Sequence, residues 1–235
     1  MSRRVLITGA TSGIGLALAA RNAARGDRQL LTGRRNEGDI RDLIPAEAAY
    51  ARIDQTDPRA AADAVPAAVK RLGWDGIDLA ILNAGSGLAA DPADETAQAI
   101  RQTLDVNAVA PMLLAHSLHP LLRAAGGRLV LVGSVARRGA SGFAAYAASK
   151  AALHGFGRAL AEEWRGDVAV RVIHPGPTAS GMHAKAGYDP GRAGRLFLPT
   201  ATMAAMIERA AAGSKPTATA SYARYLFGGY FLGRR

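Results

Sequence analysis

Cysteine is absent from the 235-residue sequence. This absence excludes disulfide bonds, a thiolate nucleophile and any metal site built on cysteine. The chain also has no apolar run long enough to span a membrane, and its start, Met1-Ser2-Arg3-Arg4, lacks the apolar segment of a secretory signal. We therefore expect a soluble, cytoplasmic protein with no membrane span.

Acidic residues are too few to balance the basic ones, with 19 Asp and Glu against 29 Lys and Arg and a formal net charge of +10. Such a balance is compatible with nucleic-acid binding. The arginines are scattered along the whole chain, however, and no basic helix or aromatic-interleaved patch is present. We expect no nucleic-acid partner, and an anionic small molecule or an acidic protein explains the charge as well.

Linkers, repeats and low-complexity segments are also missing, so nothing divides the chain. Strand-like runs at 4–8, 29–32, 49–53, 79–82, 128–132 and 169–173 alternate with Ala- and Leu-rich helical stretches at 15–25, 59–72, 97–125 and 143–164. This alternation predicts an α/β fold with a Rossmann-type, doubly wound parallel sheet in a three-layer α/β/α arrangement. We expect residues 1–235 to form a single domain.

The most informative stretch present is T-G-A-T-S-G-I-G, from Thr8 to Gly15, directly after an aliphatic run. A strand that ends in glycines and opens a helix brings backbone N–H groups and the positive end of the helix dipole to a pyrophosphate. Gly9 allows a tight turn, Gly13 removes a Cβ near the nucleotide, and Gly15 lets the helix pack on the sheet. The stretch predicts a nucleotide-binding loop, although glycine clusters also mark ordinary turns.

A second group of residues suggests chemistry at the same edge of the sheet. Tyr146 and Lys150 are four residues apart on an expected helix, which places both side chains on one face. Ser134 and the run Asn83-Ala84-Gly85 each follow an expected strand, and the carboxyl ends of parallel strands share one crevice. Taken singly, each residue has an ordinary structural explanation, such as a snorkelling pair or a cap. Their order together favours an active site.

The sequence closely resembles the short-chain dehydrogenase/reductase family in this set of motifs and in their order. The T-G-x-x-x-G-I-G form is similar to that of the compact, single-domain members, and the resemblance extends from Arg3 to about Met182. The motifs that carry it are the glycine loop, Asn83-Ala84-Gly85, Asn107, Ser134, Tyr146, Lys150 and Pro175-Gly176.

The resemblance implies an oxidoreductase that reduces a ketone or aldehyde to an alcohol, or catalyses the reverse, by hydride transfer with a nicotinamide cofactor. Tyr146 is then the general acid, Lys150 tunes the phenol and holds the ribose hydroxyls, Ser134 hydrogen-bonds the substrate oxygen, and Asn107 places a water that links Lys150 to solvent. An ammonium about 4–5 Å from a phenol supplies about 3–4 kcal/mol at an effective dielectric near 20. We therefore expect a lowered phenol pKa.

The interval from Ser134 to Tyr146 is one residue shorter than is usual in the family. A deletion in the loop at 135–143 absorbs the difference without moving either end. Ser141 is the alternative serine, but no strand fixes its position. We favour Ser134.

The type of cofactor is indicated at the end of the second expected strand. Gly33 stands where a carboxylate would bind a ribose 2′-hydroxyl, and Arg34 and Arg35 follow it. Because a guanidinium matches a phosphate, the resemblance implies NADP, with NADPH preferred over NADH and Arg34 as the main contact; solvated surface arginines are the alternative. Asp54 is implied to contact adenine. The other implied contacts are Gly9, Thr11, Ser12, Gly13, Ile14, Gly15, Asn83, Ala84, Gly85, Tyr146, Lys150, Pro175, Gly176 and Thr178.

Three further segments suggest function less specifically. Residues 175–198 form a long Gly- and Pro-containing connection, which we interpret as a substrate lid. Arg137 and Arg138 follow Ser134 at the expected substrate entrance, and they indicate either an anionic substrate or solvated charges. His174 and His183 have no carboxylate cluster nearby, so we expect no metal site. Residues 213–235 form an aromatic tail that departs from the family and puts its usual tetramer in doubt.

Two readings of the function remain as alternatives to a simple carbonyl reductase. A 3-oxoacyl-thioester reductase is one specific version, suggested by the basic entrance. A non-catalytic NADP-binding sensor or scaffold is the alternative of another class. For partners, we expect a small-molecule carbonyl or alcohol substrate and a homodimer or other homo-oligomer. The identity of the substrate is not encoded in any motif, because the substrate loops of such folds vary freely.

Overall fold

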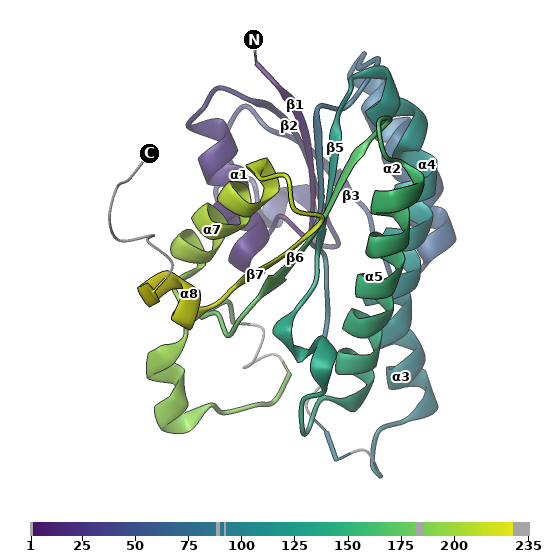
Figure 1. Ribbon diagram of the computed structural model, residues 1–235. Helices are drawn as coiled ribbons and strands as arrows, with labels where there is room; N and C mark the ends of the chain where they lie inside the picture. The colour runs from purple at the N-terminus through teal and green to yellow at the C-terminus, as the bar shows by residue number, and fades with distance from the viewer. Residues whose placement is uncertain (1, 88–89, 92, 182–185, 228–235) are drawn as a thin grey trace.

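A seven-stranded parallel sheet forms the centre of the computed structural model, which describes residues 2–87, 90–91, 93–181 and 186–227 (Figure 1). The strand order is β3-β2-β1-β4-β5-β6-β7. Most of the strands are short and aliphatic because helices cover both faces of the sheet. The strands are β1 (Arg4–Thr8), β2 (Arg28–Gly33), β3 (Ala49–Arg52), β4 (Leu79–Leu82), β5 (Arg128–Val132), β6 (Ala169–Pro175) and β7 (Thr217–Ala220).

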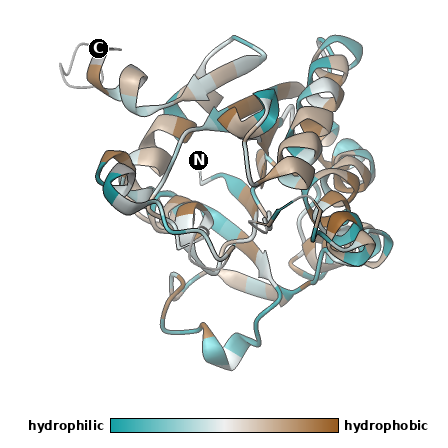
Figure 2. Ribbon diagram, turned by 90° about the horizontal axis from the view of Figure 1, so that it is seen from below, coloured by the Kyte–Doolittle hydropathy of each residue, from teal (hydrophilic) through white to brown (hydrophobic). Residues whose placement is uncertain are grey.

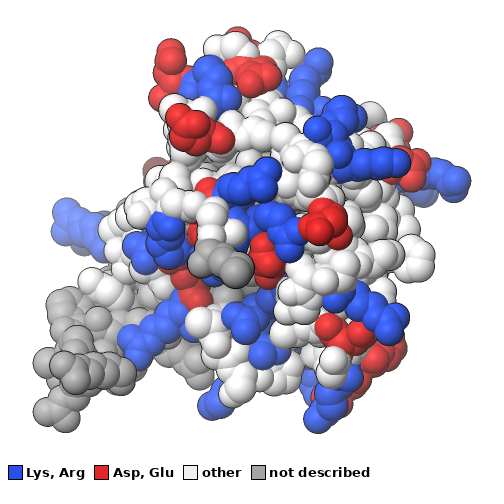
Figure 3. Space-filling view, turned by 90° about the horizontal axis from the view of Figure 1, so that it is seen from above, with Lys and Arg blue, Asp and Glu red and all other residues white. Residues whose placement is uncertain are grey.

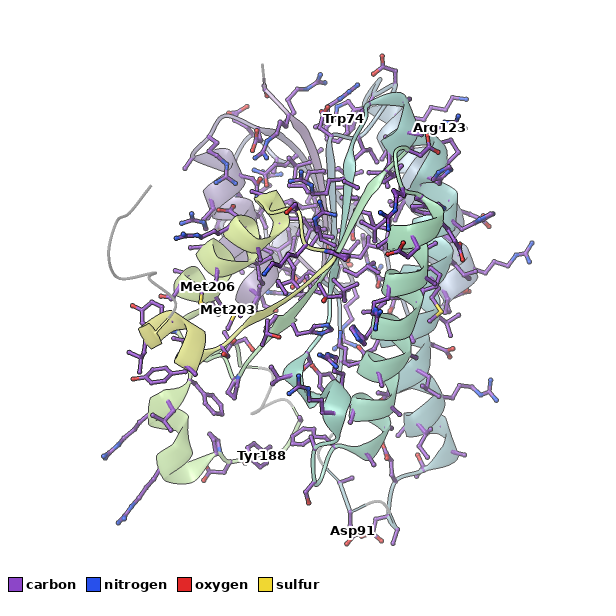
Figure 4. The ribbon with its side chains drawn as sticks, viewed as in Figure 1. Trp74, Asp91, Arg123, Tyr188, Met203 and Met206 are labelled. Atoms are coloured by element: carbon purple, nitrogen blue, oxygen red, sulfur yellow. The ribbon has the colours of Figure 1, made fainter. Side chains whose placement is uncertain are left out.

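The helices form two layers, one on each face of the sheet (Figure 1). On one face lie α1 (Gly13–Ala23) and α7 (Thr200–Ala212), whose core side chains include Leu18, Met203 and Met206 (Figure 4). On the other face lie α2 (Pro58–Arg71), α4 (Ala110–Ala124) and α5 (Ala144–Glu163), whose core includes Leu118 and Leu153. Hydrophobic and hydrophilic residues alternate in bands along the helical ribbons, as expected for helices that bury one side (Figure 2).

The predicted fold class is confirmed, and the differences from the predicted elements are local. The helix expected at 97–125 is divided into α3 (Ala97–Leu104) and α4 by a π-helical turn at Asp105–Val109. Helix α7 and strand β7 were not among the expected elements. The four residues of β7, T-A-T-A, are too short and too weakly hydrophobic to give a strand signal.

The segment at 213–235 was predicted to be an atypical tail, and its described part is more regular than that. Strand β7 pairs in parallel with β6 at the edge of the sheet, and the short helix α8 (Tyr222–Phe227) follows it. Tyr225 packs against the core that α1 and α7 share. The tail residues Tyr230 and Phe231 lie outside the described residues.

Charged side chains of both signs are intermingled on the surface. The face seen in Figure 3 lies at the amino ends of the strands and shows Lys and Arg next to Asp and Glu over most of its area. Several arginines are held in ion pairs, such as Arg3 with Asp27 and Arg21 with Glu208. No helix within the described residues has both the length and the apolar character needed to cross a membrane.

Two glycines of α5 test how tightly this helix packs on the sheet. A Cβ at Gly157 would lie 2.3 Å from Val172 Cγ2 and 2.8 Å from Leu131 Cδ1, whereas a Cβ at Gly155 would meet nothing within 4 Å. We predict that Gly157→Ala lowers the free energy of unfolding by about 1–3 kcal/mol through overpacking. Gly155→Ala should raise it by about 0.5–1 kcal/mol through helix propensity. Urea denaturation measures both, and effects of the same sign would contradict this packing.

Candidate active site

A cavity of about 870 Å³ opens at the carboxyl ends of the strands, where ligands bind in open α/β sheets. Loops that follow six strands, β1 to β6, contribute to its wall. Of the residues expected at the site, all but Gly15 and Asn107 line this cavity. Those that line it are Gly9, Thr11, Ser12, Gly13, Ile14, Arg34, Arg35, Asp54, Asn83, Ala84, Gly85, Ser134, Tyr146, Lys150, Pro175, Gly176 and Thr178.

The glycine loop needs its glycines for two different reasons. Gly9 and Gly13 have φ values of +64° and +56°, a backbone conformation that disfavours other residues. Gly15 has an ordinary φ, but a Cβ there would lie 2.2 Å from the Gly9 carbonyl oxygen. Gly15 therefore permits close packing behind the loop and does not line the cavity itself.

Hydrogen bonds from Asn83 attach the glycine loop to the end of β4. The side-chain amide of Asn83 donates to the carbonyl oxygens of Thr8 and Gly9, at 3.1 and 3.2 Å. The backbone N–H groups of Asn83 and Ala84 both donate to the Thr8 hydroxyl, at 3.0 and 3.1 Å. These bonds continue the pairing of β1 and β4 beyond the ends of both strands.

Asn107 lies in the π-helical turn and connects β4 with α5. Its amide group exchanges hydrogen bonds with the backbone of Ser86, at 2.8 and 2.7 Å. It also donates to the Ser149 hydroxyl at 3.1 Å, and Ser149 in turn donates to the Tyr146 carbonyl oxygen at 2.7 Å. π-helical turns often mark functional positions. The described contacts make Asn107 a residue that positions the wall of the cavity.

Tyr146 and Lys150 lie on one face of α5, as predicted, and both are buried, with exposed fractions of 8% and 3%. The Lys150 Nζ donates to the Val132 carbonyl oxygen at 3.0 Å and lies 5.8 Å from the centre of the Tyr146 ring. A Cβ on Gly85 would lie 3.5 Å from this Nζ and 3.1 Å from Asn107 Oδ1. Lys150 and Asn107 therefore border the same small space.

The pKa of the Tyr146 phenol differs from the prediction. Burial raises this pKa above its usual value, and a hydrogen bond with the Ser134 side chain opposes the rise. The prediction of a lowered pKa is wrong for this structure, because it counted the charge of Lys150 but not the loss of hydration of a buried phenolate. Burial also lowers the pKa of Lys150, from 10.5 to about 8.

Ser134, and not Ser141, interacts with Tyr146. The Ser134 hydroxyl also accepts a hydrogen bond from the Ala136 N–H at 3.1 Å, at the start of the 3₁₀ turn Val135–Arg138. Ser141 lies on the exposed rim of the cavity. The loop between Ser134 and Tyr146 turns at Gly139 and Gly142, which have φ values of +104° and +74°.

Arg34 and Arg35 follow β2 at the far end of the cavity from Tyr146, and their guanidinium groups differ in their contacts. The Arg35 side chain donates to the Asp39 carbonyl oxygen at 2.8 Å. Within the described part of the chain, no ion pair or hydrogen bond engages the Arg34 guanidinium, which lines the cavity and is exposed. Asp54 also lines this end, and its carboxylate accepts from the Thr56 N–H at 3.0 Å.

His174 lies at the end of β6, next to the cavity. It was expected to be either packed or exposed, and the structure shows that it is packed. It is 1% exposed, and its Nε2 lies 3.1 Å from His154 Nδ1. Burial and the nearby Arg137 lower its pKa to about 3, so it stays neutral at physiological pH. A Cβ at Gly133 would lie 2.4 Å from its Nδ1, so His174 also supports the backbone just before Ser134.

Arg137 and Arg138 do not line the cavity, contrary to their predicted place at the substrate entrance. A 3₁₀ turn rotates each successive residue by about a third of a turn. Val135 and Ala136 therefore face the cavity, while Arg137 lines a separate groove on the outer side of α5.

Several lining residues were not identified from the sequence. Phe143 lies edge-on to Tyr146 and to Tyr188, with ring centres 6.3 and 5.4 Å apart. Phe143 precedes Tyr146 by about one helical turn, so the sequence alone could have indicated that the two rings lie on the same side. Tyr188 and Phe197 come from the segment predicted as a lid, where no periodic pattern places a side chain, and Lys185 and His183 of that segment lie outside the described residues. Gln102 of α3 is another lining side chain that was not identified.

The residues present fit a nicotinamide dinucleotide. The loop that carries Gly9 and Gly13 lines the cavity with backbone that has positive φ values and no side chains at these two positions, and Arg34 presents a guanidinium at the opposite end of the cavity from Tyr146. Among the described residues, no group of three or more His, Asp or Glu side chains is placed to hold a metal ion.

Comparison with known proteins places this arrangement in a family. The family model described as short chain dehydrogenase matches residues 3–190. L-xylo-3-hexulose reductase from Hypocrea jecorina is 33% identical over 209 residues, which cover 77% of this chain and 68% of that protein. The cyclic-di-GMP-binding biofilm dispersal mediator protein of Escherichia coli is 33% identical over 184 residues, which cover 74% of this chain and 73% of that protein.

Solved structures share the fold over nearly the whole chain. A short-chain alcohol dehydrogenase from Sinorhizobium meliloti superposes with a TM-score of 0.83 and 27% identity, covering 96% of this chain and 97% of that one. A short chain dehydrogenase from Shigella flexneri, complexed with NADP, superposes with a TM-score of 0.80 and 25% identity, covering 92% and 95%. This chain therefore belongs to the short-chain dehydrogenase family, whose members bind a nicotinamide cofactor, and it is an oxidoreductase of the class that acts on CH–OH and carbonyl groups.

Proposed function

We propose that this protein is an NADP-dependent reductase that converts a ketone or aldehyde to an alcohol, or catalyses the reverse reaction. The observation that carries the proposal is the convergence of Ser134, Tyr146 and Lys150 on one wall of the cavity that also contains the glycine loop. The bound nicotinamide supplies or accepts the hydride. The protein then has to deliver a proton to the alkoxide oxygen that develops on the substrate.

Tyr146 is the proposed proton donor. Because burial raises its pKa, the phenol is protonated at neutral pH, which is the form that reduction requires. The Ser134 hydroxyl, already beside the phenol, is placed to orient the substrate oxygen, and a donor of this kind contributes about 3–4 kcal/mol in other enzymes. For the oxidation direction, the Lys150 ammonium favours the phenolate.

Lys150 and Asn107 complete the proposed proton path. Lys150 has a pKa of about 8 and is therefore mostly charged at neutral pH, so that it can hold ribose hydroxyls and stabilise negative charge on Tyr146. Asn107 borders the same space at Gly85, and its side chain is committed to Ser86 and Ser149. We assign Asn107 the role of holding the wall along which a water links Lys150 to solvent.

The preference for NADPH is supported by the contrast between the two arginines after β2. Arg34 is available to a 2′-phosphate, while Arg35 already donates to the Asp39 carbonyl oxygen. The Shigella flexneri structure with bound NADP supports the same preference by similarity. We further propose that the protein is a cytoplasmic homo-oligomer whose segment 175–198 covers the substrate.

The hypothesis of a 3-oxoacyl-thioester reductase was based on a basic substrate entrance. It is no longer supported, because neither Arg137 nor Arg138 lines the cavity. The non-catalytic reading is favoured by one similarity, to the Escherichia coli protein that is named for binding cyclic di-GMP. Turnover separates this regulator from the proposed reductase, because a sensor binds its nucleotide without oxidising NADPH.

Tyr146→Phe tests the proposed chemistry. We expect it to lower kcat for carbonyl reduction by about 10²–10⁴-fold, because the substituted ring has no proton to donate, while NADPH affinity stays within about threefold. The loss of NADPH absorbance is followed with ketones, aldehydes and a 3-oxoacyl thioester. Tyr222→Phe, a change on the half-exposed surface of α8, is the matched control. Tight NADPH binding with no turnover of any carbonyl would favour the sensor.

Arg34→Ala tests the cofactor preference. We expect the Kd for NADPH to rise about 10- to 100-fold, because a charge-assisted hydrogen bond of about 1.5–3 kcal/mol is lost, while the Kd for NADH stays nearly constant. Arg35→Ala should have a smaller effect, since its guanidinium is engaged by Asp39. Fluorescence titration measures both cofactors, and equal losses for NADPH and NADH would refute the assignment.

Lys150→Met tests the cost of the buried ammonium. The folded pKa of about 8 lies below the ordinary 10.5, so between these values the unfolded state binds more protons and wild-type stability rises with pH. We predict that the variant loses turnover but gains up to about 3 kcal/mol in unfolding free energy at pH 7, and that this gain shrinks toward pH 10.5. Denaturation at several pH values is the measurement, with exposed Lys70→Met as control. A gain that does not change with pH would disprove the explanation.

A further inference from the structure

The substrate end of the cavity differs sharply in charge from the cofactor end. Four charged side chains line the cavity within the described residues, namely Arg34, Arg35, Asp54 and Lys150. The first three lie after β2 and β3, at the far end from the proposed proton donor. Lys150 is 3% exposed and donates one of its three N–H groups to the Val132 carbonyl oxygen, and it is the group proposed above to hold the ribose hydroxyls. Every other described lining residue is uncharged.

Aromatic rings form the wall that faces a substrate held at Tyr146. Phe143 meets Tyr146 and Tyr188 edge-on, at ring-centre distances of 6.3 and 5.4 Å. Figure 4 shows Tyr188 between the segment that leads to α7 and the loops that follow β4 and β5. A Cβ at Gly87 would lie 3.2 Å from Tyr146 Cδ2, so the glycine lets the loop after β4 approach this ring closely without a side chain in between. An additional ring bound here would extend the same edge-to-face arrangement.

Among the described residues of this wall, an anionic substrate would find no exposed counter-charge. A carboxylate or phosphate that leaves water for an apolar pocket without a cationic partner pays a large desolvation cost. Arg137, the nearest arginine in sequence to Ser134, lies in the groove on the outer side of α5. Within the part of the chain that the structure describes, the exposed arginines therefore lie away from the substrate wall.

The size of the cavity also limits the substrate. The 870 Å³ volume has to hold both the dinucleotide and the substrate, and pockets of 300–1,000 Å³ normally enclose a single drug-sized ligand. The share that remains beside Tyr146 is therefore smaller than this volume, which favours a small substrate. Gln102, an exposed residue of α3 that lines the cavity, offers this molecule an uncharged hydrogen-bonding group.

We propose that the substrate is a small, uncharged ketone or aldehyde that carries an aromatic ring, and that Phe143 and Tyr188 hold this ring. The proposal rests on the proposed reductase function, because the ring is placed relative to Tyr146 as the proton donor. Tyr188 is thus a specificity-determining residue, and it acts on the ring of the substrate and not on the carbonyl.

Steady-state reduction of matched compounds tests the proposal. Acetophenone and 4-acetylbenzoate share a carbon frame around the ketone and differ in charge, while butanone lacks the ring. We expect kcat/KM for acetophenone to exceed that for each of the other two at least tenfold. If 4-acetylbenzoate is reduced as well as acetophenone or better, the substrate does not have to be uncharged and the proposal fails. If butanone is reduced as well as acetophenone, the aromatic contact does not contribute and the proposal fails.

Variants of the aromatic wall locate the effect. Tyr188→Ala should raise the KM for acetophenone about tenfold or more, with kcat and the KM for NADPH nearly unchanged and the KM for butanone unaffected. Tyr188→Phe should behave like the wild type, because the ring remains. Leu196→Ala, a change at a 57% exposed side chain that does not line the cavity, is the matched control from the same segment. A Tyr188→Ala enzyme with wild-type KM would refute the role of this ring.

Direct binding separates failure of this inference from failure of the proposed function. If no carbonyl is reduced, the reductase function fails, and saturation-transfer NMR on the cofactor-loaded protein still compares acetophenone with 4-acetylbenzoate. Binding of acetophenone that is preferred over the carboxylate and weakened by Tyr188→Ala would support the aromatic site. Equal binding of the two compounds, or binding of neither, would overturn it. Reduction of anionic ketones alone would leave the reductase intact and refute the inference.

Discussion

A continuous set of hydrogen bonds from β1 to α5 fixes the geometry on which the candidate site depends. Asn83 joins the end of β1 to the end of β4, and three residues later Ser86 exchanges hydrogen bonds with Asn107. Asn107 continues through Ser149 to the Tyr146 carbonyl oxygen. The glycine loop and the proposed proton donor are therefore held by one network of buried or half-buried polar groups, whose members are costly to leave unpaired.

Burial of polar side chains in the same region costs free energy, which the packing of the rest of the fold has to offset. Lys150 and Tyr146 are buried next to each other. Burial lowers the pKa of the lysine and raises that of the tyrosine, so in both cases it favours the neutral form. The helices and strands around them are well-packed aliphatic elements, including Leu131, Val172 and Leu153, which supply stability without polar groups. Functional groups held in an unfavourable setting by such a frame are typical of active sites.

The sequence predicted what short-range patterns and parallel topology determine. The glycine loop, the Tyr146 and Lys150 pair and Ser134 were located because strand ends and helical spacing fix them. The directions of Arg137 and Arg138 were missed, since each residue of a 3₁₀ turn points about a third of a turn away from the one before it. Tyr188 and Phe197 lie in an irregular segment where no periodicity exists, and β7 is stabilised by its pairing with β6 and not by its own residues. The raised phenol pKa depends on burial, which only the tertiary structure reveals.

The contact between Asn107 and Ser86 has a consequence for how such a protein diversifies. The hydrogen bonds at Ser86 end the network, and the chain from Gly87 onward leaves it for the loop before α3. The segment that carries Tyr188 lies outside the network as well. Neither stretch supplies a hydrogen bond of this network, so changes of length or composition there disturb the backbone that holds Ser134, Tyr146 and Lys150 less than changes within the network would. Selection can therefore alter the range of molecules accepted without first rebuilding the reaction centre.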